Sequence, residues 1–422
     1  MNVFSSRALL VAMGLAPVSA MASGFALIEQ SASGQGLSYA GAAASVEDAS
    51  VMWFNPAGLT RLEGDQFIVG GHIISPKADF TEQASVKNGA TPIGGEGDNG
   101  ATVGFVPNVY WKSRLGEYDV GFGVNVPFGQ HISYDEDWVG RYHATETDLK
   151  TLNLNPAIAR KLNDKLSFGF GLNAQYVDVI LEQKVEQSVL IEGAPDGNAK
   201  VTGNSWAFGY NLGLLYQANS DLDIGLSYRS KMQHDVEGKI DYSDINAALG
   251  GVLYDMDASS DVVLPASASL AVNYRFSAQT QLLASATWTG WSGYDELIIE
   301  LEDGSSSESN QNFEDSMRYA VGMIHQINRQ LRLRGGLAID YTPVPDKYSR
   351  SPRTPDSDRK WVSVGLGYQF SKSMNLDVGY SHLFADRSDV DYNVTTSLGS
   401  YDLRGYYESA VDILSAQLVW NF

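Results

Sequence analysis

The amino-acid sequence predicts an all-β fold, a 14-stranded antiparallel transmembrane β-barrel with an N-terminal hatch, or plug, inside its lumen. Three observations predict this fold. Apolar and polar residues alternate with a period of two over most of the chain from about Gln66 onward. The alternating segments number fourteen, which is even, and their connections are in turn short and long, as is typical of bacterial barrels.

The first 22 residues have the form of a secretory signal peptide. Arg7 precedes the apolar stretch Ala8–Val18, and Ala20-Met21-Ala22 has the small-x-small form of a cleavage site. A membrane anchor is the alternative, but Gly14 and Pro17 interrupt the stretch, which is too short to cross ~30 Å of hydrocarbon as a helix. We expect cleavage after residue 22.

The composition fits a barrel that is exported. The 422 residues include 42 glycines, 22 tyrosines and 8 tryptophans, and no apolar run of 18 residues follows the signal peptide. A barrel spreads its lipid-facing residues over alternating positions, so such a run is not expected. The absence of cysteine excludes a disulfide framework and thiolate metal sites.

The chain is strongly acidic. Its 29 basic and 50 acidic residues give a net charge of −21, and removal of Arg7 leaves 28 basic residues and a charge of −22. Nucleic acid is therefore not an expected partner, because phosphate binding needs a basic surface. Acidity of this kind ordinarily serves solubility. In outer loops it could also share divalent cations with the phosphates of lipopolysaccharide.

The stretch Leu166–Tyr176 illustrates the alternation. One face is apolar, and the other carries Ser, Gly, Asn and Gln. One face suits lipid and the other a lumen. We expect strands at 66–80, 101–112, 118–130, 147–161, 165–185, 201–217, 221–238, 260–276, 279–300, 314–328, 330–342, 358–370, 374–390 and 406–422.

The connections sort by length. Short turns such as Asn163-Asp164 and Ser277-Ala278 alternate with long loops such as 131–146 and 239–259. A soluble sandwich would also alternate in hydrophobicity, but it would not sort its loops in this strict order. The pattern places both chain ends at the short-turn, periplasmic side.

The chain ends in an alternating run from Leu414 to a terminal aromatic, Phe422. Such an ending resembles the signal read by the barrel-assembly machinery, although a generic last strand would alternate in the same way. Residues 66–422 are thus assigned to the barrel.

Residues 23–65 are rich in Gly, Ala and Ser and lack strand alternation. They could form a periplasmic tail or a hatch. Fourteen strands enclose a lumen that barrel side chains alone cannot fill, since eight strands are about the limit for that. A hatch inside the lumen is therefore the better interpretation.

Several segments resemble the FadL family of outer-membrane transporters. SGFALIEQSASGQGLSYAGAAASVEDASVMWFNPAGLTRL at 23–62 is similar to the start of the mature family members. The similarity continues in VPNVYW at 106–111, VGFGVNVPFG at 120–129 and TDLKTLNLNPAIARKLNDKLSFGFGLNAQY at 147–176. Beyond these segments the resemblance depends on the strand count and the terminal aromatic residue.

The resemblance implies passive uptake of long-chain fatty acids or similar hydrophobic molecules across the bacterial outer membrane. Outer loops would capture the ligand, an internal pocket gated by the N-terminus would hold it, and it would leave sideways through the wall. Because each buried methylene contributes roughly 0.8 kcal/mol, successive apolar sites would draw such a ligand forward where a watery channel would not.

The resemblance also assigns residues to this route. The gating N-terminus would be Ser23, Gly24, Phe25, Ala26 and Leu27; the hatch motif, packed against a kink in the third strand, would be Asn55, Pro56 and Ala57; and the kink that opens the wall would be Pro127, Phe128 and Gly129. Proline cannot donate to a ladder, and glycine permits a sharp bend.

Simpler interpretations remain beside these assignments. Residues 23–27 could be a disordered tail, although Phe25 and Leu27 would then lie in water. Asn-Pro-Ala-Gly also suits a plain type I turn, and the third strand could simply end at Val126.

The loop at 239–259 contains a candidate capture groove. Ile245, Leu249, Val252 and Leu253 have a helical spacing that predicts a short amphipathic helix, which could line a groove or merely pack on its own loop. Basic residues that could pair with a ligand carboxylate include Lys184, Arg229 and Arg334, but the sequence does not choose among them.

We predict no enzymatic activity, no cofactor and no metal site, because none of the six histidines shows metal-ligand spacing along the chain. We expect a monomer in contact with outer-membrane lipid. Two alternatives to fatty-acid uptake remain: an aromatic-hydrocarbon channel of the same family, and a receptor or structural barrel without transport.

Overall fold

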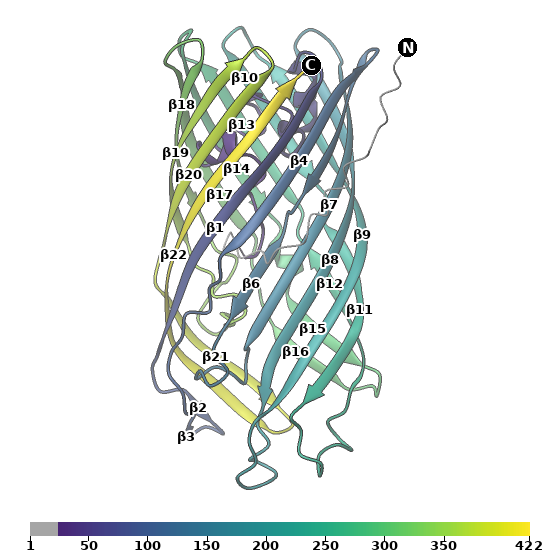
Figure 1. Cartoon of the computed structure of the whole chain (residues 1–422), viewed down its shortest axis with the longest axis vertical. Helices are drawn as coiled ribbons and strands as arrows, with labels where there is room; N and C mark the ends of the chain where they lie inside the picture. Colours follow the sequence, from purple (N-terminus) through teal and green to yellow (C-terminus); the bar gives the residue numbers. More distant parts are fainter. Residues whose placement is uncertain (1–23) are drawn as a thin grey trace, which may run out of the picture.

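The computed structural model describes residues 24–422, drawn from purple to yellow in Figure 1. The predicted signal peptide and Ser23 lie outside the described residues. Four short helices occur in the described range: α1 (Ala32–Gln35), α2 (Val51–Phe54), and the 3-10 helices η1 (Pro56–Arg61) and η2 (Trp291–Gly293). None of these helices has the length and apolar character needed to cross a membrane.

Fourteen antiparallel wall strands close into one barrel (Figure 1). We call each of them a stave, because some are made of two labelled strands joined end to end. Around the barrel they are β1 (Gln66–Glu82), β4 (Gly104–Leu115), β5 (Tyr118–Asn125) with β6 (Gly129–Ser133), β7 (Glu146–Lys161), β8 (Leu166–Val185), β9 (Gly197–Gln217), β10 (Leu222–Arg229) with β11 (Met232–Ser243), β13 (Ser267–Arg275) with β12 (Met256–Leu264), β14 (Thr280–Thr289) with β15 (Glu296–Leu301), β17 (Ser316–Gln326) with β16 (Ser306–Asn310), β18 (Leu331–Asp340), β19 (Arg359–Ser371), β20 (Met374–Ala385) with β21 (Ser388–Thr396), and β22 (Gly399–Asn421). A small hairpin, β2 (Val86–Lys87) and β3 (Thr91–Pro92), lies in the loop after β1. The predicted count of fourteen is confirmed.

Closure comes from the first and last strands. β1 pairs with β22 from Gln66↔Asn421 to Glu82↔Gly405, and with β4 on its other side. An edge strand would expose unpaired backbone groups to hydrocarbon, where each costs several kcal/mol, so closure is what lets the sheet span lipid.

The two faces of the wall differ as the alternation predicts. On β8, Phe168 and Leu172 point outward and are 38% and 55% exposed, whereas Asn173 and Gln175 are buried in the interior. Asn173 Oδ1 accepts a hydrogen bond of 3.0 Å from Asn153 on the neighbouring strand. Amides thus line the lumen, and apolar side chains face the lipid.

Five of the predicted strands are each split in two by the structure: 118–130, 221–238, 260–276, 279–300 and 374–390. Pro127 and Pro265 stand in two of the breaks, where a missing N–H interrupts the ladder. The inward-facing positions change between odd and even residue numbers across four of these breaks, as from Asp223 and Gly225 to Met232 and His234, and they keep their parity between β14 and β15.

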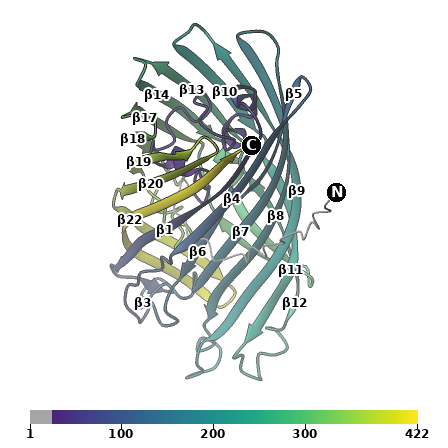
Figure 2. The ribbon, with the colours of Figure 1, turned by 45° about the horizontal axis from the view of Figure 1, so that its top comes forward.

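Residues 24–65, here called the N-terminal segment, lie inside the barrel (Figure 2, purple). α1 contacts β19, β20 and β22, whereas η1 contacts β7, β8 and β9 on the opposite wall. A segment of this length can touch both walls only by crossing the lumen.

An ionic cluster fixes the N-terminal segment to the wall. Glu47 pairs with Arg334 at 2.8 Å, and the same guanidinium reaches Asp377 at 2.7 Å. Gln417 of β22 donates to Asp48 at 2.8 Å. Arg334, considered above as a partner for a ligand carboxylate, is therefore already occupied by two protein carboxylates.

Candidate functional site: two cavities and the segment between them

The third stave is interrupted at residues 126–128. β5 pairs with β4 only as far as Val124, opposite Val109, and β6 resumes at Gly129 against β7. Beyond that point, residues 104–108 of β4 keep β1 as their ladder partner among the described strands. The wall therefore lacks a continuous ladder between β4 and β6.

The start of the N-terminal segment occupies this interruption. Ala26 forms an antiparallel bridge with Phe128, and the neighbouring backbone groups are paired as well. The hydrogen bonds are Leu27 N–H to Pro127 O (2.8 Å), Gly129 N–H to Phe25 O (3.0 Å), Gln30 Nε2 to Val126 O (2.8 Å) and Phe128 N–H to Thr151 Oγ1 (3.0 Å). Residues 25–30 thus act as a short extra strand that satisfies the break.

Phe25 anchors that short strand in a cluster of rings. Its ring centroid lies 4.8 Å from that of Trp291, 5.4 Å from Tyr294 and 6.1 Å from Phe128, all edge to face. Phe313 joins the cluster through Trp291 at 5.7 Å. We call these five residues the aromatic cluster; edge-to-face pairs of this kind contribute about 0.5–1.5 kcal/mol each beyond area burial.

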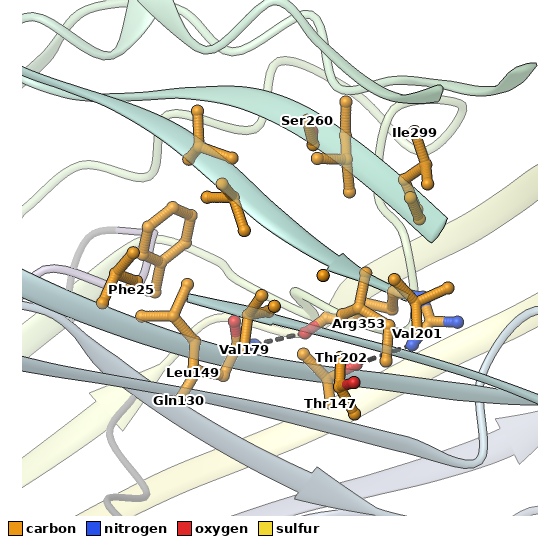
Figure 3. A pocket seen from close by; sticks show the side chains of 18 of the residues that line it. Phe25, Gln130, Thr147, Leu149, Val179, Val201, Thr202, Ser260, Ile299 and Arg353 are labelled. Atoms are coloured by element: carbon orange, nitrogen blue, oxygen red, sulfur yellow. Dashed lines mark hydrogen bonds between the residues drawn. The ribbon is translucent and has the colours of Figure 1, made fainter. Parts of the chain in front are cut away.

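An outer cavity of about 880 Å³ lies on the long-loop side of the aromatic cluster (Figure 3). Phe25 and Tyr294 belong to its lining. Aliphatic side chains dominate the rest: Leu149, Val177, Val179, Leu181, Val201, Val236, Val262, Leu297 and Ile299.

Arg353 is the charged residue that lines the outer cavity (Figure 3). It comes from the loop between β18 and β19, and its guanidinium donates to Glu146 O at 2.8 Å and Thr147 Oγ1 at 2.9 Å. Gln130 donates to its carbonyl oxygen. Burial lowers the pKa of Arg353 to about 10, so the guanidinium still carries its charge at neutral pH.

An inner cavity of about 1110 Å³ lies on the other side of Phe128. Leu27, Phe54, Pro127 and Phe128 line it, so it meets both the N-terminal segment and the interrupted stave. The two cavities are thus separated by residues 25–28 and the aromatic cluster.

Two guanidinium groups line the inner cavity. Arg229 lies over the ring of Trp53 at 3.6 Å and donates to Trp53 O at 2.8 Å. Arg318 donates to Ser38 O at 2.8 Å and faces Asp340, which also lines the cavity. Of the three basic residues considered from the sequence, Arg229 therefore lies at a cavity, whereas Lys184 pairs with Glu136 outside it at 2.7 Å.

A loop acid binds the start of the N-terminal segment, and a second acid is buried within that segment. Gly24 N–H donates to Asp356 Oδ2 at 2.9 Å, and Asp356 belongs to the same loop as Arg353. Glu29 is 1% exposed, and burial raises its pKa to about 7. The loop at 341–358 therefore contacts both the outer cavity and the N-terminus.

The hatch motif is bonded to β9. Asn55 donates to Ala43 O at 2.6 Å and to Leu214 O at 2.9 Å, and Ala57 N–H donates to Asn55 Oδ1 at 3.0 Å. The helix η1, which begins at Pro56, contacts β5 of the third stave as well as β7, β8 and β9, and Pro56 lines the inner cavity together with Pro127 and Phe128. Packing of the motif against the kink itself stays a prediction, and the backbone groups of the kink pair with residues 25–30.

The expected helix in the loop at 239–259 is not formed. Residues 246–253 make consecutive turns, with Leu249 buried and Val252 72% exposed. Leu253 packs on a small cluster containing Val185, Ile240 and Met256. Among the described linings, Ile245, Leu249, Val252 and Leu253 contribute to neither cavity, so their assignment to a capture groove remains a prediction.

The sequence did not identify Arg353, Asp356, Glu29 or the ring of Trp291. All four lie outside strands, where no periodic pattern marks a residue as inward facing. Trp291 offered one signal, since it starts a short break between two strands in Gly290-Trp291-Ser292-Gly293.

A closed barrel with an apolar outer wall and two apolar cavities in its lumen belongs to the class of outer-membrane channels for hydrophobic solutes. The chain is a member of the family of outer membrane protein transport proteins (OMPP1/FadL/TodX), whose model matches residues 13–422. It is therefore an outer-membrane transporter of hydrophobic compounds and not an enzyme.

Relatives and solved structures agree with this membership. The chain is 30% identical to the long-chain fatty acid transport protein of Escherichia coli O6:H1, over 92% of each chain. It is 29% identical to outer membrane protein P1 of Haemophilus influenzae, over 91% of this chain and 90% of that protein.

Among solved structures, the crystal structure of a Pseudomonas aeruginosa FadL homologue superposes with a TM-score of 0.89 at 22% identity, covering 94% of this chain and all of the other. The Ralstonia pickettii toluene transporter TbuX gives a TM-score of 0.68 at 17% identity over 94% of this chain. At these identities the two structures show the shared fold.

Proposed function

We propose that this protein takes up long-chain fatty acids, or molecules of similar length and apolarity, by passive movement from the outer cavity past Phe25 into the inner cavity and out through the third stave. The observation that carries the proposal is the position of residues 25–28. They separate the two cavities and at the same time complete the broken ladder.

Movement of this one segment would have two effects. Displacing Phe25 removes the wall between the cavities, and releasing residues 25–27 leaves Pro127 O and Gly129 N–H without their backbone partners. The same displacement would therefore join the cavities and open the wall toward the lipid. No external energy is needed, because burial of a methylene contributes about 0.8 kcal/mol at each apolar stage.

The lining of the outer cavity favours an alkyl chain with an acidic end. Its walls are mostly Val, Leu and Ile, which suit an unbranched chain, and one guanidinium, that of Arg353, lies in the lining. Charged hydrogen bonds contribute about 1.5–3 kcal/mol. A carboxylate bound to Arg353 would also compete with the bonds that hold its loop.

The test is binding of a fluorescent long-chain fatty acid to protein purified in detergent. We expect saturable binding that Arg353→Gln weakens roughly ten- to a hundredfold, the range that loss of one charged hydrogen bond implies. Arg387→Gln is the matched control, since Arg387 lies in the break between β20 and β21, stacks on Tyr406 of β22 at 3.5 Å and lines neither cavity. Equal affinities for all three proteins would contradict the assignment of Arg353, and absence of binding would contradict fatty-acid uptake.

Binding of toluene distinguishes a fatty-acid channel from the main alternative, an aromatic-hydrocarbon channel. An aromatic-hydrocarbon channel should bind toluene with an affinity that Arg353→Gln does not change and should prefer it to oleate. A receptor barrel should bind neither, and deletion of its gene should leave uptake unchanged.

A further inference from the structure

Three side chains of metal-ligating type meet on the wall next to the interrupted stave. His131 of β6 and Glu146 and Asp148 of β7 each offer one ligand atom, and these atoms lie within 4.8 Å of one another. His131 Nε2 is 3.5 Å from Glu146 Oε1. Within residues 24–422 this is the group in which histidine and carboxylates come together so closely.

The three side chains point away from the lumen. Thr147 and Leu149 line the outer cavity, so their neighbours at 146 and 148 face the opposite side of the sheet. His131 is directly opposite Asp148 in the ladder and shares that face. The group is therefore on the outer surface of the barrel and separate from the ligand route.

The group lies at the level where the wall turns from apolar to polar. Tyr176 and Trp206 form an outward aromatic pair with ring centroids 5.3 Å apart, typical of the girdle at a membrane boundary. The next outward rows toward the long loops carry Asp178, then Asp148, then Glu146 and Glu182. Water and ions can reach residues at this level.

The local charges leave a deficit of positive charge. Four carboxylates on this outward face (Glu146, Asp148, Asp178 and Glu182) accompany two ammonium groups, Lys150 and Lys200, so the charges of these carboxylates and ammonium groups sum to −2. Lys150 pairs with Asp148 at 2.5 Å, but Asp178 is directly opposite Lys150 in the ladder and offers it a second carboxylate.

Asp148 supplies a second observation that points to a ligand. Its side chain is 7% exposed, and its Oδ1 is buried without a hydrogen-bond partner among the described residues. Buried carboxylate oxygens are almost always satisfied, and a cation is one of the partners that can satisfy them. Thr102 Oγ1 contacts His131 Nδ1 at 2.9 Å, which orients the ring with Nε2 toward Glu146.

We propose that His131, Glu146 and Asp148 bind one divalent cation of the Zn²⁺ class on the outer wall. A histidine nitrogen with two carboxylates suits Zn²⁺ better than Mg²⁺ or Ca²⁺, which prefer oxygen ligands alone. Three protein ligands leave a position open toward the exterior. Bound there, the ion links β6 to β7.

That link matters because β6 has a continuous ladder on one side, with β7. On its other side the described residues give it isolated contacts: the bridge from Ile132 to Ala101, and the hydrogen bonds from Ser133 N–H to Gly100 O at 2.8 Å and from Gly129 N–H to Phe25 O at 3.0 Å. The ion would strengthen the attachment of the half-stave that borders the interruption.

The test uses tag-free protein folded in detergent, stripped with EDTA and titrated with ZnCl2 by calorimetry. We expect one saturable site per chain, lost in His131→Ala and in Asp148→Asn. Co²⁺ serves as a spectroscopic probe, and its visible absorption should lose intensity in the same two variants. Zn²⁺ should also raise the Tm of the wild-type protein and leave that of the variants unchanged.

His382→Ala is the matched control. His382 also lies on the outer wall and contacts a carboxylate, Asp412, at 2.8 Å. Among the described residues, no second carboxylate joins this pair to form a group of three possible metal ligands. This variant should bind Zn²⁺ as the wild type does. Wild-type protein without a saturable site, or His131→Ala with an unchanged affinity, would overturn the proposal. His131→Gln removes the ligand nitrogen with a smaller change of side-chain size. If this variant keeps the heat-modifiable migration of the folded barrel in gels, its loss of Zn²⁺ binding is loss of the site and not failure to fold.

Discussion

Phe25 contacts three other rings and lines one cavity while its neighbours line the next. Truncation of a buried phenylalanine to alanine costs about 3–5 kcal/mol. In Phe25→Ala we expect residues 25–30 to undock more often and a bound fluorescent fatty acid to leave faster in stopped-flow measurements. Phe208→Ala is the control, since Phe208 is 77% exposed on the lipid face. A release rate equal to that of the wild type would mean that the ring does not limit passage.

Glu29 gives the docking of the N-terminal segment a dependence on pH. Burial raises the pKa of Glu29 from 4.5 to about 7, and the neighbouring charges of Arg318 and Arg359 oppose this shift. The docked segment therefore binds more protons than the undocked one between these two values, so docking weakens as the pH rises through this window and is strongest below it.

Hydrogen exchange of residues 24–30 measures that dependence. Exchange, corrected for its intrinsic pH dependence, should show less protection at about pH 8 than at about pH 5.5, and Glu29→Gln should flatten the difference. Greater protection at the higher pH would contradict the assignment, as would an unchanged profile in the variant.

The positions of individual side chains were the features least predictable from the sequence. The gating residues from Gly24 to Leu27 were proposed from a resemblance, and the aromatic rings they meet come from distant strands and loops. Arg353 and Asp356 belong to a loop of irregular backbone, where side-chain direction follows no period. The proposed metal group was not predicted for a related reason: spacing along the chain does not show that His131 faces Asp148 across a ladder.

Two glycines of the wall make room for the hatch motif. A Cβ at Gly213 would lie 2.0 Å from Asn55 Oδ1, and one at Gly169 would lie 2.3 Å from Ala57 N. In Gly213→Val and Gly169→Val the N-terminal segment cannot seat against β8 and β9. We expect a barrel that still folds, with increased protease sensitivity around residues 55–57 and weaker fatty-acid binding.

Gly335 of β18 supplies the control for these variants. Nothing lies within 4 Å of a Cβ built at Gly335, so Gly335→Val should leave protease sensitivity as in the wild type. If all three variants had the same increased protease sensitivity, the increase would come from loss of a strand glycine and not from displacement of the hatch motif.

Strands were predictable because the wall separates two environments. Lipid outside and amides inside impose strict alternation, and the observed bounds of β8, Leu166–Val185, lie within a residue of the predicted range. The break at Trp291 was not predictable, because β14 and β15 keep the same facing on either side of it: Thr287 and Thr289 line the inner cavity, and Leu297 and Ile299 line the outer one. The helix predicted over 245–253 is absent although the spacing of apolar residues favours one. A helix this short makes too few backbone hydrogen bonds to offset the cost of its first turn.

For the whole molecule, the decisive feature is that the N-terminal segment touches opposite walls. Liposomes containing the protein should therefore not swell in small sugars, whereas liposomes with a general porin should. Rapid swelling with the wild-type protein would show a water-filled route beside the segment and would contradict passage through separate apolar cavities.

Gly24 is bonded to Asp356 within the barrel, and this position constrains how the protein can be prepared. A recombinant affinity tag fused ahead of that residue would compete for the space on which docking depends, and a polyhistidine sequence there would add its own metal affinity. The exposed hairpin tip at Asp303 and Gly304 offers a better place for an epitope or a dye.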